Sequence, residues 1–199
     1  MTDSSTYWEQ RYLSGRNSGD GSYGRLATFK AQVINAFVAK QAVRSVIEFG
    51  CGDGNQLSLA EYPDYIGYDV SPTAIAQCRA RFADDATKAF HPYADHDGET
   101  AELALSLDVI FHLTEDDVFA DHMKTLFAAA DRFAIVYSSD HEEDWSEIAP
   151  HVRHHNFSAW VAKNRPDFEL VERIANPWPF EMGRSGTSFA DFFIYRRVV

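Results

Sequence analysis

The chain has 199 residues, the size of one domain, and its 30 acidic side chains outnumber 18 basic ones to give a formal charge of −12. A duplex-DNA or anionic-membrane partner is disfavoured, because neutralising phosphates requires a basic face. Two cysteines are too few for a disulfide framework, and no apolar run approaches the roughly 18 to 20 residues of a membrane span. The N-terminus carries acid and lacks the apolar stretch of a signal peptide, so we expect a soluble, cytoplasmic protein.

Hydrophobic periodicity predicts alternating strands and helices after an N-terminal loop of 24 polar and aromatic residues. Short apolar runs next to glycine or turn residues predict strands at 45–49, 65–70, 88–93, 102–107, 133–137, 169–175 and 188–196. Apolar residues three or four positions apart predict helices that begin near 26, 56, 71, 114 and 157. Ser71 and Pro72 supply an N-cap and a first-turn proline, and Thr114 with Asp117 resembles a capping box.

Five alternations of strand and helix predict a doubly wound α/β fold with a mostly parallel, seven-stranded sheet. The last two strands are expected to form an antiparallel edge, and the whole chain, 1–199, is expected to be one domain. In such sheets a ligand lies outside the carboxyl ends of the strands, where the strand order reverses. The segment that follows the first strand, 50–54, is therefore the expected centre of the site.

The most informative segment is the glycine-rich loop after that strand, where Gly50, Gly52 and Gly54 alternate with other residues. Glycines let the backbone turn tightly and approach a ligand closely. The dinucleotide fingerprint would place its third glycine at position 55, which is Asn55 here, so a nicotinamide or flavin dehydrogenase is disfavoured. The loop also lacks the Gly-Lys-Ser/Thr of a phosphate loop, which disfavours a nucleoside triphosphate.

Acidic residues follow or interrupt the first three strands. Asp69 ends the second strand, where a carboxylate can accept two hydrogen bonds from a ribose diol. After the third strand, either Asp95 or Asp97 can accept from the exocyclic amine of adenine, although both also fit ordinary loop positions. Glu48 lies inside the first strand, where burial is costly unless a ligand ammonium or a nearby donor pairs with it.

These features together resemble a class I S-adenosylmethionine-dependent methyltransferase of the small-molecule branch. The pattern E-x-G-x-G-x-G, the segment Ser106–Leu113 and the opening Trp8–Tyr12 with Gly15 carry the resemblance. It implies that the methionine end of the cofactor meets Glu48, Gly50 and Gly52, the ribose Asp69 and the adenine Asp95. Gly54, Leu107, Trp8 and Tyr12 complete the expected cofactor contacts. Absence of an Asn-Pro-Pro-Tyr-like motif disfavours methylation of an amide or base nitrogen.

Methyl transfer from a sulfonium requires positioning, exclusion of water and, for an oxygen nucleophile, removal of a proton. Aromatic rings attract a soft cation, so the tyrosines and tryptophan of segment 1–24 are expected to close over the cofactor as a lid on the 25–199 core. His151 or His154 is the expected base, with His112 as another candidate close to the substrate. Asp108 is expected to orient the substrate.

The histidines beside the acidic loop 140–144 also permit a metal site, but their HxxHH spacing matches no strong zinc pattern, so none is expected. The acidic loop is either a solvated face or a means of raising histidine pKa values.

We therefore expect an enzyme that methylates a small molecule, and we expect the acceptor to be the hydroxyl of a sugar or natural product. A thiol or halide methyltransferase is the nearest enzymatic alternative, since such an acceptor needs no strong base. A regulatory protein that binds S-adenosylmethionine without transferring its methyl group is the alternative from another class. The oligomeric state is left open.

Overall fold

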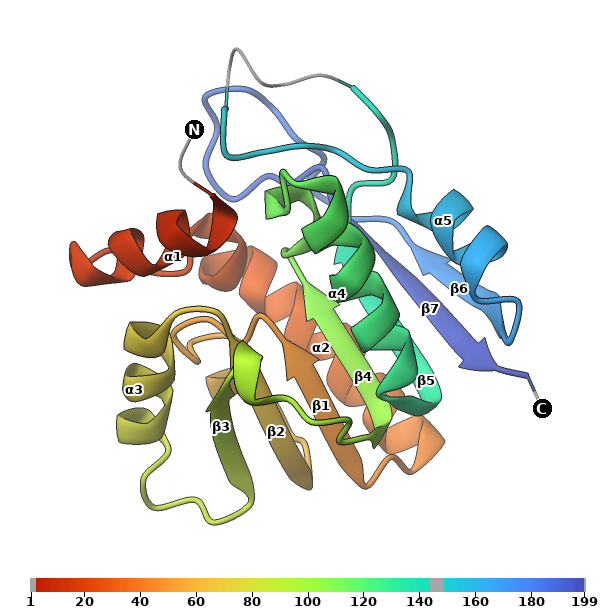
Figure 1. Ribbon diagram of the computed structural model, residues 1–199, viewed down its shortest axis with the longest axis horizontal. Coiled ribbons are helices and arrows are strands. Elements are labelled where there is room, and N and C mark those ends of the chain that lie inside the picture. The colour runs from red at the N-terminus through yellow and green to blue at the C-terminus, as the bar shows by residue number, and fades with distance from the viewer. Residues whose placement is uncertain (1–2, 144–148, 199) are drawn as a thin grey trace.

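One sheet organises the computed structural model, which describes residues 3–143 and 149–198. Within these residues the sheet has seven strands in the order β3-β2-β1-β4-β5-β7-β6 (Figure 1). The strands are β1 Ser45–Phe49, β2 Asp64–Asp69, β3 Lys88–Pro92, β4 Ala101–Leu107, β5 Ala130–Ser138, β6 Phe168–Ile174 and β7 Asp191–Arg197. Strands β1 to β5 are parallel, whereas β7 pairs antiparallel with both β5 and β6. The predicted fold class is confirmed.

Helices cover both faces of the sheet. These helices are α2 Gly24–Gln41, α3 Pro72–Arg81, α4 Asp116–Ala128 and α5 Phe157–Asn164, whereas α1 Ser4–Leu13 lies beyond the carboxyl ends of the strands (Figure 1). Buried residues of α2 and α3 belong to one hydrophobic cluster, and those of α4 and α5 belong to the other. The two clusters lie on opposite faces of the sheet, as expected for a doubly wound fold. No helix in the described part of the chain is both long and apolar enough to cross a membrane.

The strand order reverses beside β1, which has β2 on one side and β4 on the other. Crossover connections therefore leave an opening at the carboxyl ends of these strands. Figure 1 shows the arrowheads of β1 and β4 pointing toward α1 and the loops at the top of the view.

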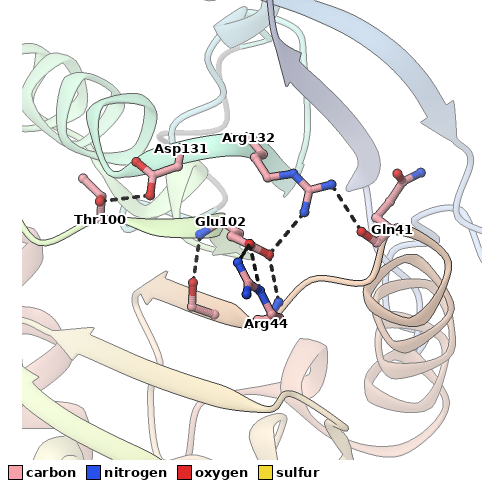
Figure 2. Close-up of polar contacts among 7 residues, drawn as sticks. Gln41, Arg44, Thr100, Glu102, Asp131 and Arg132 are labelled. Carbon is pink, nitrogen blue, oxygen red and sulfur yellow. Dashed lines mark hydrogen bonds and ion pairs between the residues drawn. The ribbon is translucent and has the colours of Figure 1, made fainter.

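The amino ends of the central strands are joined by Glu102, the second residue of β4. Its carboxylate accepts from the Arg44 backbone N–H at 2.9 Å and from the Arg44 guanidinium at 3.0 Å. Arg132 of β5 donates to the same carboxylate at 3.2 Å (Figure 2). This cluster of three residues lies at the opposite end of the strands from the glycine-rich loop.

The N-terminal segment differs from the prediction, because residues 4–13 form a helix instead of a mobile loop. Asp3 caps the helix by accepting from the Thr6 backbone N–H at 2.8 Å. The Tyr12 side chain is buried, so tertiary packing adds to the local cap.

Three other predicted boundaries also move. The helix expected over 56–61 is a single short turn, Leu57–Leu59, and β7 begins at Asp191 instead of 188. The predicted capping box at Thr114 is wrong, because the N-cap of α4 is Glu115 and makes no side-chain cap. The Glu115 carboxylate instead accepts from the Ser4 backbone N–H at 3.0 Å, so a contact with α1 replaces the local cap.

Candidate active site

A cavity of about 440 Å³ opens at the carboxyl ends of the central strands, within the roughly 300 to 1,000 Å³ typical of small-molecule sites. Its walls come from the glycine-rich loop, from α1 and from the segment that follows β4. Most of the site residues predicted from sequence line it: Trp8, Tyr12, Glu48, Gly50, Gly52, Asp69, Leu107, Asp108 and His112. Four others lie outside its lining: Gly54, Asp95, His151 and His154.

Gly52 allows the N-terminal segment to lie directly over the glycine-rich loop. Its φ of +58° is in the left-handed region, and a Cβ there would lie 2.4 Å from Ser18 Oγ. Gly54 lets α3 pack closely against the glycine-rich loop, because a Cβ at that position would lie 3.0 Å from Cys78 Sγ of α3. The third glycine therefore lets α3 approach the loop, whereas Gly52 faces the cavity.

Asp69 is a buried carboxylate at the end of β2 that holds the glycine-rich loop in place. Its two oxygens accept from the backbone N–H groups of Gly52 and Ser71, each at 2.9 Å. Each oxygen keeps a second lone pair. Burial raises the pKa of Asp69 to about 6 despite these two hydrogen bonds.

Glu48 is buried in β1 and has a protein donor. The Tyr65 hydroxyl donates to its carboxylate at 2.6 Å. Burial raises the pKa of Glu48 to about 7, although the Tyr65 hydrogen bond and the nearby Lys30 charge oppose the rise. The site thus contains an acid that changes its charge near neutral pH.

Lys30 of α2 is a cavity residue that sequence reasoning missed. Its side chain is only 1% exposed, and Nζ lies 2.5 Å from Asp108 Oδ2. Asp108, the residue after β4, has a φ of +59°, which is a left-handed backbone conformation that residues other than glycine rarely adopt. The signal was present, because Lys30 lies four residues after Leu26 on the apolar face of its helix.

His112 lines the cavity, and a backbone contact fixes which of its ring nitrogens carries the hydrogen. Its Nδ1 lies 3.0 Å from the backbone carbonyl oxygen of His151. A carbonyl can only accept, so Nδ1 carries the hydrogen and Nε2 carries the lone pair. Burial lowers the pKa of His112 to about 4. The Trp8 ring packs edge-on against this imidazole, with 4.9 Å between ring centroids.

The other two predicted bases, His151 and His154, do not line the cavity. The His151 ring is stacked between Tyr7, at 5.0 Å, and His112, at 5.6 Å. The His154 ring is buried, hydrogen-bonded to Ser139 Oγ at 2.7 Å and packed edge-on against Phe189. Burial lowers the pKa of both histidines. Among the described residues no group of three or more His, Cys, Asp or Glu is arranged to hold a metal ion.

The wall nearest β3 differs from the expectation of an acidic adenine site. Asp95 and Asp97 are both exposed, and neither lines the cavity. Tyr93, from the turn after β3, and His122, from α4, line it instead. Sequence reasoning missed His122, a buried histidine within the apolar face of α4.

The N-terminal segment forms the roof of the cavity and is tied to the core by buried or half-buried polar contacts. Glu9 of α1 accepts from Ser71 Oγ at 2.5 Å and from Thr73 Oγ1 at 2.7 Å, both at the start of α3. Asp53 of the glycine-rich loop accepts from the Ser18 backbone N–H at 3.0 Å and from the Tyr23 hydroxyl at 2.8 Å.

The lining has the polar groups that an amino-acid nucleoside such as S-adenosylmethionine requires. Asp69 retains lone pairs for a diol, and Lys30 is a buried cation suited to a carboxylate. Gln56 donates to the Ala27 carbonyl at 3.1 Å, and its buried Oε1 has no hydrogen-bond donor among the described residues. A buried acceptor without a donor is costly, which favours a ligand that donates there.

Comparisons with known proteins show the family and the fold of this chain. A family model described as a methyltransferase domain matches residues 23–178, and no curated protein matches the chain. The N-methyltransferase NodS from Bradyrhizobium japonicum WM9, solved with S-adenosyl-L-homocysteine, superposes with a TM-score of 0.75 at 15% identity over 98% of this chain and 99% of its own.

Two further solved structures have the same fold. The magnesium protoporphyrin IX methyltransferase ChlM from Synechocystis PCC 6803, with bound SAM, has a TM-score of 0.69 at 16% identity and covers 100% of this chain and 99% of its own. An S-adenosylmethionine-dependent methyltransferase from Clostridium acetobutylicum ATCC 824 has a TM-score of 0.63 at 7% identity, covering 96% of each chain. The resemblance to class I methyltransferases is confirmed, and the chain belongs to the methyltransferase-domain family.

Proposed function

We propose that this enzyme transfers the methyl group of S-adenosylmethionine to a hydroxyl group of a small molecule. The observation that carries the proposal is His112, which lines the same cavity as Glu48 and Asp69 with its Nε2 deprotonated. A hydroxyl nucleophile must lose a proton, and His112 Nε2 is free of a proton at neutral pH and can accept it, as a weaker base than an ordinary imidazole because its pKa is lowered to about 4. Two solved neighbours, an N-methyltransferase and a magnesium protoporphyrin IX methyltransferase, are described as acting on different acceptors.

The residues at the carboxyl ends of β1 and β2 bind the cofactor in this proposal. Asp69 accepts from the ribose hydroxyls through its remaining lone pairs. Lys30 binds the carboxylate of the amino-acid end, while Glu48 and Gln56 face its ammonium. S-adenosylmethionine supplies the electrophilic methyl group, and these side chains bind and orient it.

Residues of α1 and the segment after β4 position the acceptor. Trp8 and Tyr12 line the roof of the cavity, where aromatic rings suit a sulfonium. His112 takes the hydroxyl proton on Nε2, and the His151 carbonyl fixes the ring by accepting from Nδ1. Asp108 orients the acceptor while it is paired with Lys30. The imidazoles of His151 and His154 have no direct role, because neither lines the cavity.

The experiment is a methyl-transfer assay, read by mass spectrometry, with alcohols, sugars, phenols, amines, thiols and halide as acceptors. Binding of S-adenosylmethionine, S-adenosylhomocysteine and a nicotinamide cofactor is measured alongside by calorimetry. We expect saturable binding of the two adenosyl ligands only, and methylation of a hydroxyl acceptor. His112→Gln should lower kcat about 100-fold, the usual contribution of a general base, with little change in S-adenosylhomocysteine affinity.

Other outcomes separate the alternatives. Turnover with only thiol or halide acceptors, unaffected by His112→Gln, would replace the hydroxyl assignment with thiol or halide methylation. Tight adenosyl-ligand binding without turnover on any acceptor would indicate a regulatory protein. Loss of binding in Asp69→Asn together with retained folding would support the ribose assignment.

A further inference from the structure

His122 is a buried polar side chain on the cavity wall that the proposed reaction does not use. It lies on α4 between apolar residues and is only 4% exposed. The same side chain lines the cavity. A histidine in this position is either a core residue with all its hydrogen bonds inside the protein or a residue that contacts the ligand.

The protonation state of His122 follows from its one protein partner. Its Nε2 lies 2.8 Å from Ser106 Oγ of β4, and the Ser106 side chain is fully buried. Within residues 3–143 and 149–198 this hydroxyl has no other polar partner. An unpaired buried O–H is costly, so Ser106 donates and Nε2 accepts.

The hydrogen of the imidazole is therefore on Nδ1. Burial lowers the pKa of His122 to about 4, so the ring carries a single hydrogen at neutral pH. Nδ1 has no hydrogen-bond partner in the described part of the chain. His122 thus brings an N–H donor without a protein acceptor to a cavity wall.

The surroundings of His122 suit a flat heterocycle. The Tyr93 ring lies nearly parallel to the imidazole, with 17° between the ring planes and 6.4 Å between centroids. Val70, Leu107 and Val118 contribute apolar surface to the same cavity. Tyr93 follows β3, which lies beside β2 and its last residue Asp69, whereas His122 comes from α4 and bonds to Ser106 of β4. The two rings therefore reach the cavity from elements on both sides of the ribose position.

We propose that His122 recognises the adenine ring of the cofactor by donating its Nδ1 hydrogen to one of the ring nitrogens. This inference rests on the proposed function, because it takes S-adenosylmethionine as the ligand. Adenine ring nitrogens are acceptors, so they complement an N–H, whereas the exposed Asp95 carboxylate could only accept from the exocyclic amine. Ser106 is a positioning residue that fixes which imidazole nitrogen carries the hydrogen.

The test is a calorimetric comparison of S-adenosylhomocysteine with its 1-deaza, 3-deaza and 7-deaza analogues, each of which replaces one ring nitrogen by C–H. Wild type is compared with His122→Gln, His122→Asn and His155→Gln. Gln can retain the contact with Ser106 but lacks a donor at the Nδ1 position, whereas the Asn amide can replace that donor. His155 is the matched control, because it is a buried histidine bonded to the Leu113 carbonyl outside the cavity lining.

We expect one analogue to bind wild type about 10-fold more weakly than S-adenosylhomocysteine, the usual effect of losing one hydrogen bond. The ratio of the Kd of this analogue to the Kd of S-adenosylhomocysteine should fall to about 1 in His122→Gln. It should stay at about 10 in His122→Asn and His155→Gln. An unchanged ratio in a folded His122→Gln would overturn the proposal. Failure of S-adenosylhomocysteine to bind wild type would instead contradict the proposed function.

A measurement on wild type keeps the proposal testable if the variants do not fold. With 15N-labelled histidine and an adenine-labelled ligand, NMR should detect a coupling across the hydrogen bond between Nδ1 and a ring nitrogen. A His122 Nδ1–H that exchanges with water equally fast in the presence and absence of bound S-adenosylhomocysteine would exclude the contact.

Discussion

Glu48 connects the chemistry of the site to the stability of the fold. Its folded-state pKa of about 7 exceeds the ordinary value of 4.5, so the folded protein binds more protons than the unfolded chain between these values. The stabilisation is therefore present at low pH and is lost as pH rises toward 7. Glu48→Gln keeps an acceptor for Tyr65 but removes this titration.

We predict that the unfolding free energy of Glu48→Gln minus that of wild type is about 2 kcal/mol more favourable at about pH 8 than at about pH 5. The reason is that wild type loses stability over this range and the variant does not. Urea unfolding of the two proteins at both pH values measures this change. A difference in unfolding free energy that does not vary with pH would show that Glu48 titrates normally in the folded state.

His112 makes a second pH prediction, for the reaction itself. Because burial lowers its pKa to about 4, its Nε2 stays deprotonated where an ordinary imidazole begins to gain a proton. We expect kcat/KM for a hydroxyl acceptor, measured in Glu48→Gln at saturating S-adenosylmethionine so that Glu48 does not titrate, to stay nearly constant from about pH 7.5 to about pH 6. A loss of activity with an apparent pKa near 6.5 would show that another histidine, or an exposed His112, is the base.

Among single residues, the sequence predicted the cavity residues that lie in or directly after a strand. Glu48, Asp69 and the glycines are placed by β1 and β2, so their lining of the cavity could be anticipated. Lys30 and His122 were missed because a polar residue within an apolar helical face also fits a structural role. Asp95 is exposed, because the conformation of the turn after β3 decides which of its side chains faces the cavity, and Tyr93 does; the role of Asp95 at adenine stays a prediction.

Helix α1 is the element that closes the site, and Glu9 bonds it to the start of α3. The carboxylate accepts from Ser71 and Thr73 at the N-terminus of α3, where a negative charge also interacts favourably with the helix dipole. Hydrogen bonds from these two side chains hold the pKa of Glu9 below its usual range.

We predict that Glu9→Gln speeds dissociation of S-adenosylhomocysteine about 10-fold, because one charge-assisted contact is worth roughly 1.5 kcal/mol. Stopped-flow release and hydrogen exchange over residues 4–13 measure the effect. Glu61→Gln is the matched control on an exposed glutamate away from the cavity. Equal dissociation rates in all three proteins would show that α1 does not limit ligand release.

Helix α1 was not predicted, because local sequence patterns do not show contacts between residues that are distant in the sequence. Strands β1 to β5 have apolar runs that specify burial on both faces, and their prediction was accurate to one or two residues, apart from the early start of β5 at Ala130. The sequence of α1 is polar with scattered aromatic residues, and its helix is supported by contacts with distant residues such as Glu115, Ser71 and Thr73. Such contacts have no sequence signature, so propensity alone favoured a loop.

For the whole molecule, the two ends of the parallel strands have separate roles. The cavity occupies the carboxyl ends, whereas the Glu102 cluster with Arg44 and Arg132 joins β1, β4 and β5 at the amino ends (Figure 2). No residue of that cluster lines the cavity. Free-energy changes at distant sites are usually additive. The stability contributed by the Glu102 cluster should therefore not depend on ligand binding in the cavity.

We predict that Glu102→Gln lowers the unfolding free energy by about 1 kcal/mol or less, because Arg44 and Arg132 are solvent-exposed. Its affinity for S-adenosylhomocysteine should match that of wild type. Ligand at about 100 times its Kd should then stabilise both proteins equally, by about 2.7 kcal/mol. Urea unfolding with and without ligand measures both the loss of unfolding free energy in the variant and the stabilisation by the ligand. A nicotinamide cofactor is the control that should not change the unfolding free energy. An unequal shift would mean that the two ends of the sheet are coupled, and that binding energy at the cavity depends on how tightly the amino ends of the central strands are held.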